Sequence, residues 1–188
     1  TSIEICIVSS DIINFMKRCK SNEASNVSEM LNTYFEYWNS IIKKHCGTID
    51  KYIGDAIMVI FGLEDEQHSS ENTINCALEA INNWNNLIES LISKNLPIPD
   101  GFGIGCHFGE LIIGDIGSKD RKNITVVGDT VNIASRLEAM TRNTNKELLI
   151  SESIFEKINV GLQSKFEKIG MVKVKGKTNS IMIWGNKK

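Results

Sequence analysis

This sequence has few prolines, no long apolar segment and little net charge. Its two prolines both lie between Leu96 and Asp100, which predicts a loop at that point. No apolar run approaches the roughly 20 residues that a membrane-spanning helix needs, and no signal-peptide pattern opens the chain. With a net charge of −2, the sequence does not resemble that of a protein with a basic surface for nucleic acids or membranes. We therefore expect a domain with no membrane or nucleic-acid contact.

Cysteine pairs are also lacking. The five cysteines are odd in number, scattered, and without C-x-x-C spacing: Cys6, Cys19, Cys46, Cys76 and Cys106. This pattern predicts reduced thiols in the cytoplasm rather than a disulfide framework or a zinc site.

Length and composition are those of one globular domain. The 188 residues, 41% hydrophobic and 23% charged, are enough for a substantial core, so we predict a single domain over residues 1–188. A strand pattern begins at the second or third residue. We therefore expect a domain excised from a longer, regulated protein.

Hydrophobic periodicity predicts the first elements. Alternation over positions 3–7 predicts a strand with Asp11 just past its end. Apolar residues at helical spacing then predict a long amphipathic helix from Val27 to Ile42, with Gly47 well placed to stop it. A hairpin follows, formed by Thr48–Tyr52 and Ala56–Phe61. The next predicted element is a second amphipathic helix over Ile74–Leu91. A second hairpin around Gly109-Glu110 is predicted from Gly103–His107 and Leu111–Ile116.

The remaining chain predicts another helix and three further strands. The helix runs from Val131 to Met140 and is capped by Asp129 or Thr130. The strands are predicted at Leu148–Ile150, Phe166–Val174 and Ile181–Trp184. A short helix, Ser151–Ile158, is predicted directly after the first of them. The β-α-β-β-α-β order of the first hundred or so residues predicts an α+β fold with a ferredoxin-like, palm-type core. This is an antiparallel sheet with helices on one face and additional C-terminal strands.

Two acidic residues, Asp11 and Asp55, each stand at the end of a predicted buried strand. A lone aspartate at such a point is more often a turn former. Carboxylates, however, avoid apolar surroundings unless their charge is compensated. Mg²⁺ is usually held by one or two carboxylates plus substrate phosphates. The pair therefore predicts a metal–nucleotide site.

A third segment, Thr125–Glu138, places Asn132 and Arg136 four residues apart on one face of the predicted helix. The planar guanidinium of Arg136 suits phosphate oxygens. Asn132 is placed to orient a sugar or a phosphate beside it. The two residues predict a nucleotide-binding surface on the helix.

Together these motifs resemble the class III nucleotidyl cyclase catalytic domain, the family that includes adenylate and guanylate cyclases. The resemblance covers nearly the whole chain and rests on the Asp11 segment, Lys51–Met58, Gly105–Glu110, Ile116–Ser118, Val127–Arg136 and Val174–Lys177. It implies an enzyme, a phosphorus–oxygen lyase that makes a cyclic nucleotide in the cytoplasm, with an upstream sensor or regulatory domain in the full-length protein.

The resemblance implies roles for the matching residues. Asp11, Asp55 and the backbone carbonyl of Ile12 match the family's ligands to two divalent metal ions, Mg²⁺ or Mn²⁺. Asn132 matches the residue that positions the ribose, and Arg136 the one that stabilises the transition state at the α-phosphate. The implied reaction is a two-metal phosphoryl transfer, in which the 3′-hydroxyl attacks the α-phosphorus and pyrophosphate leaves.

Other matches concern the triphosphate and the base. Lys175, with Lys173 as the alternative, matches the lysine that contacts the triphosphate, and the loop that includes Phe15 wraps the β- and γ-phosphates. Lys51 and Thr125 match the purine-selecting pair, in which lysine donates to adenine N1 and threonine accepts from the N6 amino group. Guanylate cyclases have Glu and usually Cys at these positions. The pair thus predicts ATP as substrate and resembles the soluble, bicarbonate-responsive adenylate cyclases and their cyanobacterial relatives.

Family active sites lie between two domains in a head-to-tail pair. Asp11 and Asp55 would come from one chain, and the partner would supply Lys51, Thr125, Asn132, Arg136 and Lys175. This chain carries both sets, so the resemblance implies a symmetric homodimer with two equivalent sites.

The sequence departs from the family pattern at a few positions. Ser9, Asn14 and Met16 stand where Phe, Gly and Thr are usual, and Glu110 stands where some members have a phosphate-binding Arg. No metal ligand is lost. A guanylate or relaxed-specificity cyclase and a non-catalytic nucleotide-binding dimerisation module are the alternatives. A diguanylate cyclase shares the palm-like fold, but its Gly-Gly-Asp/Glu-Glu-Phe run is absent from the sequence.

Overall fold

The computed structural model describes residues 2–118, 121–174 and 179–188. Side chains are described for these residues except 2–10, 113, 115–118 and 121–127, where only the backbone is described. The elements are β1 (Ser2–Ile12), α1 (Phe15–Ser21), α2 (Ala24–Lys44), β2 (Gly47–Ile53), β3 (Ala56–Phe61), α3 (Ser69–Asn82), α4 (Trp84–Ser93), β4 (Phe102–Ser118), β5 (Arg121–Val127), α5 (Asp129–Thr144), β6 (Leu148–Ser151), α6 (Glu152–Phe155), α7 (Val160–Gln163), β7 (Phe166–Lys173) and β8 (Ser180–Asn186). With α1 as an addition before α2, the predicted β-α-β-β-α-β order is confirmed.

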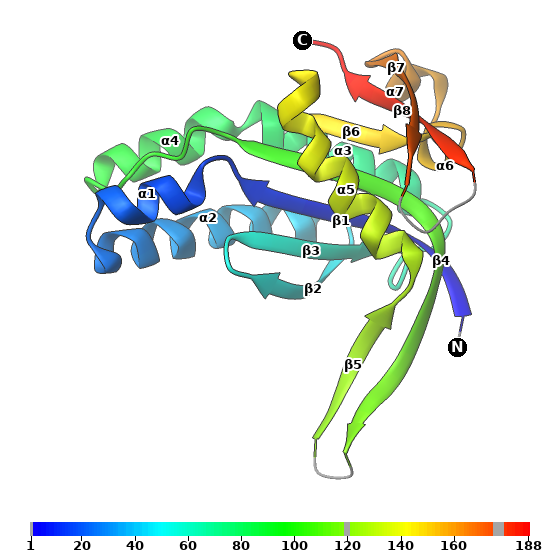
Figure 1. Cartoon of the computed structure of the whole chain (residues 1–188), viewed down its shortest axis with the longest axis horizontal. Helices are drawn as coiled ribbons and strands as arrows, with labels where there is room; N and C mark the ends of the chain where they lie inside the picture. The colour runs from blue at the N-terminus through cyan, green and yellow to red at the C-terminus, as the bar shows by residue number, and fades with distance from the viewer. Residues whose placement is uncertain (1, 119–120, 175–178) are drawn as a thin grey trace.

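The strands form one sheet in the order β2-β3-β1-β4-β6-β8-β7, with β5 paired to β4 beyond this path. The described strand pairs are antiparallel except β4 with β6, which run parallel. The chain between β4 and β6 includes β5 and α5, which is long enough for the crossover that a parallel pair needs. Figure 1 shows the second half of β4 leaving the body of the molecule with β5 as a two-stranded arm.

Helices cover both faces of the sheet, whereas only one covered face was predicted. Alternate side chains of β3 enter different cores because successive residues of a strand point to opposite faces. Val59 and Phe61 join the main core, to which α2, α3 and α4 contribute. Met58 and Ile60 instead pack with Ala134 of α5. In Figure 1, α5 crosses the near face of the sheet and α3 lies behind it. The α+β class with a ferredoxin-like core is confirmed.

The long amphipathic helix is α2. Its apolar residues recur at helical spacing and are buried on one face: Val27, Met30, Tyr34, Trp38, Ile41 and Ile42. The helix ends before Cys46, which has the left-handed φ of 59° that reverses the chain, and Gly47 opens β2. The prediction that Gly47 stops the helix is therefore wrong. Within the described ranges, no helix combines the length and apolarity required to cross a membrane.

Asn83 divides the predicted second helix into α3 and α4. Its backbone N–H donates to the carbonyl of Glu79 at 2.9 Å and closes α3, and α4 then begins at Trp84. Asn82 and Asn83 are both weak helix formers. The break places Trp84 against Phe102, with ring centroids 4.7 Å apart. The prediction of one continuous helix is wrong, although both helices contribute to the same core.

The predicted hairpin around Gly109-Glu110 is also wrong. β4 passes through these residues without turning and stays paired with β1. The hairpin is instead formed by β4 and β5, and β5 was not predicted. A Cβ atom at Gly109 would meet Oγ1 of Thr130 at 2.7 Å. The glycine therefore permits a close approach of α5 to the strand, which a local sequence pattern does not distinguish from a turn.

The start of α5 is fixed by a contact with β4. The residue before the helix is Gly128, so the prediction of Asp129 or Thr130 as the cap is wrong. The hydroxyl group of Thr130 instead donates to the backbone carbonyl of Glu110 at 2.6 Å. This bond ties the first turn of α5 to the middle of β4.

The predicted C-terminal strands are confirmed as β6, β7 and β8. The helix predicted over Ser151–Ile158 is shorter and comprises α6 alone. A second short helix, α7, follows it, and the side chain of Asn159 caps it by accepting the N–H of Leu162 at 3.0 Å.

Candidate active site

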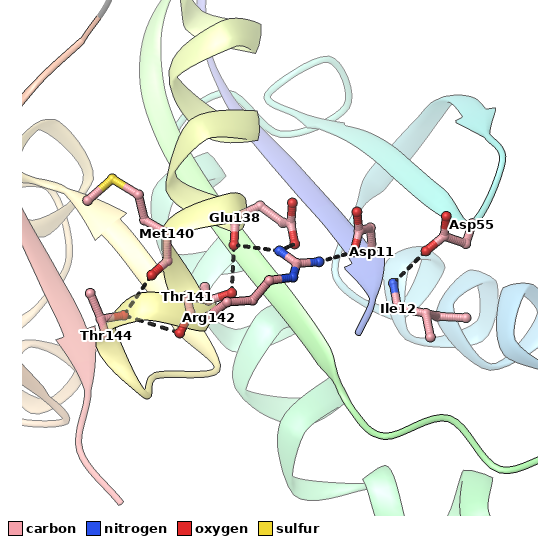
Figure 2. Close-up of polar contacts among 8 residues, drawn as sticks. All are labelled: Asp11, Ile12, Asp55, Glu138, Met140, Thr141, Arg142 and Thr144. Carbon is pink, nitrogen blue, oxygen red and sulfur yellow. Dashed lines mark hydrogen bonds and ion pairs between the residues drawn. The ribbon is translucent and has the colours of Figure 1, made fainter. Parts of the chain in front are cut away.

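Asp11 and Asp55 come together where the end of β1 meets the turn between β2 and β3. Asp11 lies within β1, opposite Gly103, because β4 keeps β1 paired through Ile12. The prediction that Asp11 lies just past the strand is therefore wrong. Oδ2 of Asp55 accepts a hydrogen bond from the backbone N–H of Ile12 at 2.9 Å (Figure 2). The structure thus brings together the two residues predicted to bind metal, because Asp55 is bonded to the residue that follows Asp11.

The turn that carries Asp55 is short. β2 and β3 pair as far as Ile53 and Ala56, which leaves only Gly54 and Asp55 between them. Gly54 has a φ of 60°, a conformation that glycine adopts without steric cost. The predicted hairpin is confirmed, and its two-residue turn holds the carboxylate at the tip.

The surroundings of Asp11 disfavour its ionised form. Partial burial raises the pKa of this carboxyl group above its ordinary value, the charge of Arg142 lowers it, and repulsion from Asp55 raises it further. Two neighbouring carboxylates repel each other, so a cation between them would be favoured.

Glu138 and Arg142 join Asp11 in a network that was not predicted. Nη1 of Arg142 donates to Oε1 of Glu138 at 2.7 Å and to the Glu138 carbonyl at 3.4 Å, and Nη2 forms an ion pair with Oδ1 of Asp11 (Figure 2). Glu138 is buried, and this burial, together with the charge of Asp11, raises its pKa to about 7. The predicted helix ended at Met140 and left Arg142 outside. The spacing of four between Glu138 and Arg142 was the available signal.

Asn132 and Arg136 lie on the first half of α5, and both are exposed. The opposite side of the helix is held by buried residues, among them Ile133 and Leu137. Within the described part of the chain, neither Asn132 nor Arg136 forms a hydrogen bond or ion pair with the two aspartates. The structure therefore brings Asp11 and Asp55 together but leaves the predicted catalytic residues of α5 outside that contact.

Lys51 lies on β2 beside an irregularity. The register of β2 against β3 shifts between Ile49 and Lys51, which places a β-bulge at Asp50. Bulges commonly re-aim side chains next to active sites. Nζ of Lys51 lies 3.4 Å from the buried carboxylate of Asp50, and the lysine side chain is 41% exposed. Lys51 is thus available on the surface.

The other predicted nucleotide-binding residues are placed only in part. Thr125 lies on β5, with its backbone paired to Gly114, and its side chain is outside the described set. Lys175 lies outside the described residues altogether. The alternative, Lys173, is exposed at the end of β7, where it pairs with Ser180. The roles of these residues stay predictions.

The loop after β1 contains a residue in an unusual conformation. Asn14 has a φ of 58°, a left-handed conformation that Gly adopts freely and Asn tolerates better than most residues. The asparagine thus satisfies the backbone geometry at a position where the resembled family usually has Gly. Its side chain donates to Asp100 at 3.0 Å. Phe15 then begins α1 and packs, half-buried, against the main core.

The donors around Asp11 and Asp55 fit a divalent ion of the Mg²⁺ type. They comprise two carboxylates and the backbone carbonyl of Ile12, all hard oxygen ligands. In residues 2–118, 121–174 and 179–188, no group of three or more His, Cys, Asp or Glu side chains is placed to hold a metal by itself. Mg²⁺ sites that use one or two carboxylates are completed by water and substrate phosphates. The donor set therefore suits a metal shared between protein and nucleotide.

Comparison with known proteins shows the family to which the chain belongs. The family model described as the adenylate and guanylate cyclase catalytic domain matches residues 1–186. The chain therefore belongs to this family of class III nucleotidyl cyclase catalytic domains.

Relatives of both specificities are similar to the chain. An adenylate cyclase of Anabaena cylindrica is 31% identical over 93% of this chain and 35% of its own length. Adenylate cyclase 1 of Rhizobium meliloti is 29% identical over 96% of the chain and 27% of its own length. The crystal structure of the guanylyl cyclase Cya2 superposes with a TM-score of 0.86, at 28% identity, over 99% of this chain and 92% of that one. The chain thus spans about a third or less of the two curated relatives.

Proposed function

We propose that this chain is the catalytic domain of an adenylate cyclase that converts ATP to 3′,5′-cyclic AMP and pyrophosphate. The observation that carries the proposal is the meeting of Asp11 and Asp55 at the end of β1, where Asp55 accepts the N–H of Ile12 at 2.9 Å. A module that served only for dimerisation would have no need of two adjoining carboxylates at this point. Partial burial and, to a lesser extent, repulsion from Asp55 raise the pKa of Asp11, and bound cations would relieve this repulsion.

Asp11, Asp55 and the carbonyl of Ile12 would hold two divalent ions, Mg²⁺ or Mn²⁺. When bound, such ions lower the pKa of an attacking hydroxyl group and neutralise charge on a leaving phosphate. Arg136 would place its guanidinium against the α-phosphate, where negative charge develops in the transition state. Asn132 would hold the ribose so that its 3′-hydroxyl faces the α-phosphorus.

The site would be assembled from two copies of the chain in a head-to-tail homodimer. Asn132 and Arg136 are exposed on α5, and in the described part of the chain they have no polar contact with Asp11 or Asp55. Their exposure supports a role toward a partner chain. A two-fold axis would then reproduce the complete set of residues at two equivalent sites.

Base selection is assigned to Lys51 and Thr125. A lysine donates to adenine N1 and a threonine hydroxyl accepts from the N6 amino group, a pattern that guanine does not match. The 41% exposure of the Lys51 side chain leaves it available for this contact. The similarity to adenylate cyclases of Anabaena cylindrica and Rhizobium meliloti also supports ATP as substrate.

Guanylate cyclase activity is the second candidate. It is favoured by the similarity to the guanylyl cyclase Cya2, whose structure superposes with a TM-score of 0.86. Relaxed specificity would reconcile both sets of relatives. Product analysis with ATP and GTP in parallel separates these possibilities.

We also place the domain in the cytoplasm, as part of a longer protein with a sensor or regulatory domain. The free thiols of Cys19, Cys46 and Cys76 support a reducing compartment. The greater length of the relatives supports further domains, since the chain spans 27% and 35% of two of them.

The test is an assay of the purified chain with ATP or GTP and with Mg²⁺ or Mn²⁺, at concentrations that support dimers, with chromatographic separation of the products. Asp55→Asn is assayed alongside. We expect cyclic AMP from ATP, reduced at least about 100-fold in the variant, because a metal contributes several kcal/mol to the transition state.

Other products give a different conclusion. Cyclic GMP alone would replace the adenylate assignment with the guanylate one. Background turnover of both nucleotides, equal to that of Asp55→Asn, would indicate a non-catalytic nucleotide-binding module.

A further inference from the structure

The guanidinium group of Arg142 lies where a cation would approach Asp11. Its Nη2 forms an ion pair with Oδ1 of Asp11, while Nη1 donates to Oε1 of Glu138 at 2.7 Å (Figure 2). We propose that Arg142 occupies the cation position at Asp11 in the absence of metal, and that a divalent ion must displace it. Arg142 would thus be a positioning residue that lowers the metal affinity of the site. This inference rests on the metal site of the proposed function.

The two proposed metal ligands are held in different ways. Asp55 is fixed by the backbone N–H of Ile12 at 2.9 Å, a bond that metal binding does not have to break. Asp11 is held by a side chain, and the oxygen that pairs with Arg142 is a site where a metal would coordinate. Asp55 is therefore already held in position for metal binding, whereas Asp11 must first release its ion pair with Arg142.

The positive charge of Arg142 opposes the binding of a metal ion at Asp11. An arginine is always protonated, so near Asp11 it repels an incoming divalent ion and competes with it for the same carboxylate. Burial weakens the screening of this repulsion by salt. The side chains of Arg142 and Asp11 are 34% and 31% exposed, so the pair is partly shielded from water.

The arginine has an anchor and space into which it can move. Glu138, on the same face of α5, is bonded to Nη1 and would keep that bond after Nη2 leaves Asp11. Arg142 also lines a cavity of about 460 Å³, whose lining residues include Asp100 and Glu147. The guanidinium can therefore leave Asp11 without unwinding the helix.

A supporting role for Arg142 predicts the opposite effect. If the arginine only held Asp11 in a productive orientation, its removal would weaken metal binding. If it competes with the metal, its removal will strengthen metal binding. The sign of the change therefore decides between the two roles, independently of catalytic activity.

The experiment measures Mn²⁺ binding to the full chain by electron paramagnetic resonance of the free ion, without nucleotide, at fixed ionic strength. We expect Arg142→Gln to lower the Kd for Mn²⁺ by roughly threefold to tenfold. Arg18→Gln is the matched control, because Arg18 forms a similar ion pair with Asp100, and its side chain is 37% exposed. This control should leave the Kd unchanged. Asp55→Asn reports whether the measured ion occupies the proposed site.

The variant Arg142→Gln leaves the buried Glu138 without its ionic partner, so the double variant Glu138→Gln with Arg142→Gln is measured too. Tighter binding in either variant, with Arg18→Gln unchanged, supports displacement. Equal or weaker binding in both, while Asp55→Asn binds less than the wild type, overturns the inference and leaves the proposed function intact. Binding that Asp55→Asn does not alter, or no binding to the wild type, overturns the metal site and the inference with it.

Discussion

The carboxylate of Asp55 accepts a hydrogen bond at 2.9 Å from the backbone N–H of Ile12, a residue 43 positions earlier in the chain. This bond ties the tip of the β2–β3 hairpin to the end of β1. It means that Asp55 has two separable properties, an acceptor oxygen that supports the fold and a negative charge that the proposed chemistry requires.

Two substitutions at Asp55 should separate these properties. Both Asp55→Asn and Asp55→Ala should lose cyclase activity, because neither offers a carboxylate. Only Asp55→Ala leaves the N–H of Ile12 without an acceptor, so it should be less stable than Asp55→Asn by about 1–3 kcal/mol. Urea denaturation measures this difference. Equal stability of the two variants would mean that water replaces the lost acceptor.

Mixing inactive chains tests the shared active site. Asp55→Asn and Arg136→Ala should each be inactive alone, but an equal mixture should recover about a quarter of wild-type activity. This fraction follows because half of randomly formed dimers are mixed and each contains one intact site of two.

The control for this experiment mixes Asp11→Asn with Asp55→Asn. Both changes affect the residues contributed by one chain to each site, so every dimer lacks an intact site. Recovery in this control, or no recovery in the first mixture at concentrations that support dimers, would contradict a site shared between chains.

The preference for ATP over GTP should depend on Lys51 of β2 and Thr125 of β5. Lys51→Glu combined with Thr125→Cys should lower the ratio of kcat/KM for ATP to that for GTP by about tenfold or more, because unmatched polar groups at the base cost about 1–3 kcal/mol. Lys43→Glu, an exposed change of the same charge on α2, should not alter the ratio. A ratio that stays constant in the double variant would place base recognition elsewhere.

The approach of α5 to the sheet should depend on Gly105. A Cβ atom there would meet the carbonyl oxygen of Ala134 at 2.2 Å and the backbone nitrogen of Glu138 at 2.3 Å. Neither backbone atom can move without shifting the helix, so Gly105→Ala should cost about 3 kcal/mol or more. Gly114→Ala, where a Cβ meets nothing within 4 Å, should change the free energy of unfolding by less than about 1 kcal/mol. Similar losses in the two variants would contradict this packing.

Acid stability should depend on Glu79. Nε2 of His45 lies 2.7 Å from one oxygen of Glu79, and Lys44 donates to the other at 3.0 Å. These contacts, with that of His45 the larger, lower the pKa of Glu79 below its ordinary value of 4.5. A lowered pKa in the folded state gives stability that is present above pH 4.5 and is lost as the pH falls through the folded value.

The difference in free energy of unfolding between wild type and Glu79→Gln should therefore be present at pH 5 and shrink below about pH 4.5. Urea denaturation at each pH measures it. Glu89→Gln, at an exposed position on α4, serves as the control. A difference that does not narrow in acid would show that the contacts of Glu79 add no charge-dependent stability.

Much of the candidate site follows from short stretches of sequence. Asp55 could be placed at a hairpin tip because Gly54 precedes it and apolar runs flank it, and both are local signals. Asn132 and Arg136 could be placed on one helix face from their spacing. These predictions succeed because strand alternation, turn residues and helical periodicity act over a few residues.

Other features depended on contacts that no local pattern contains. Gly109 was predicted to form a turn, but the approach of Thr130 explains the glycine. Asn83 breaks a helix whose apolar pattern continues, because Trp84 packs on Phe102.

The sequence by itself therefore determined the order of the first elements, the carboxylate pair and the family resemblance. Only the tertiary structure decided that β4 is continuous, that α5 covers the second face of the sheet, and that Arg142 meets Asp11 across 131 positions of chain. The physical reason is that periodicity fixes which residues share a face. Strand register and helix packing then decide which faces, and which charges, come into contact.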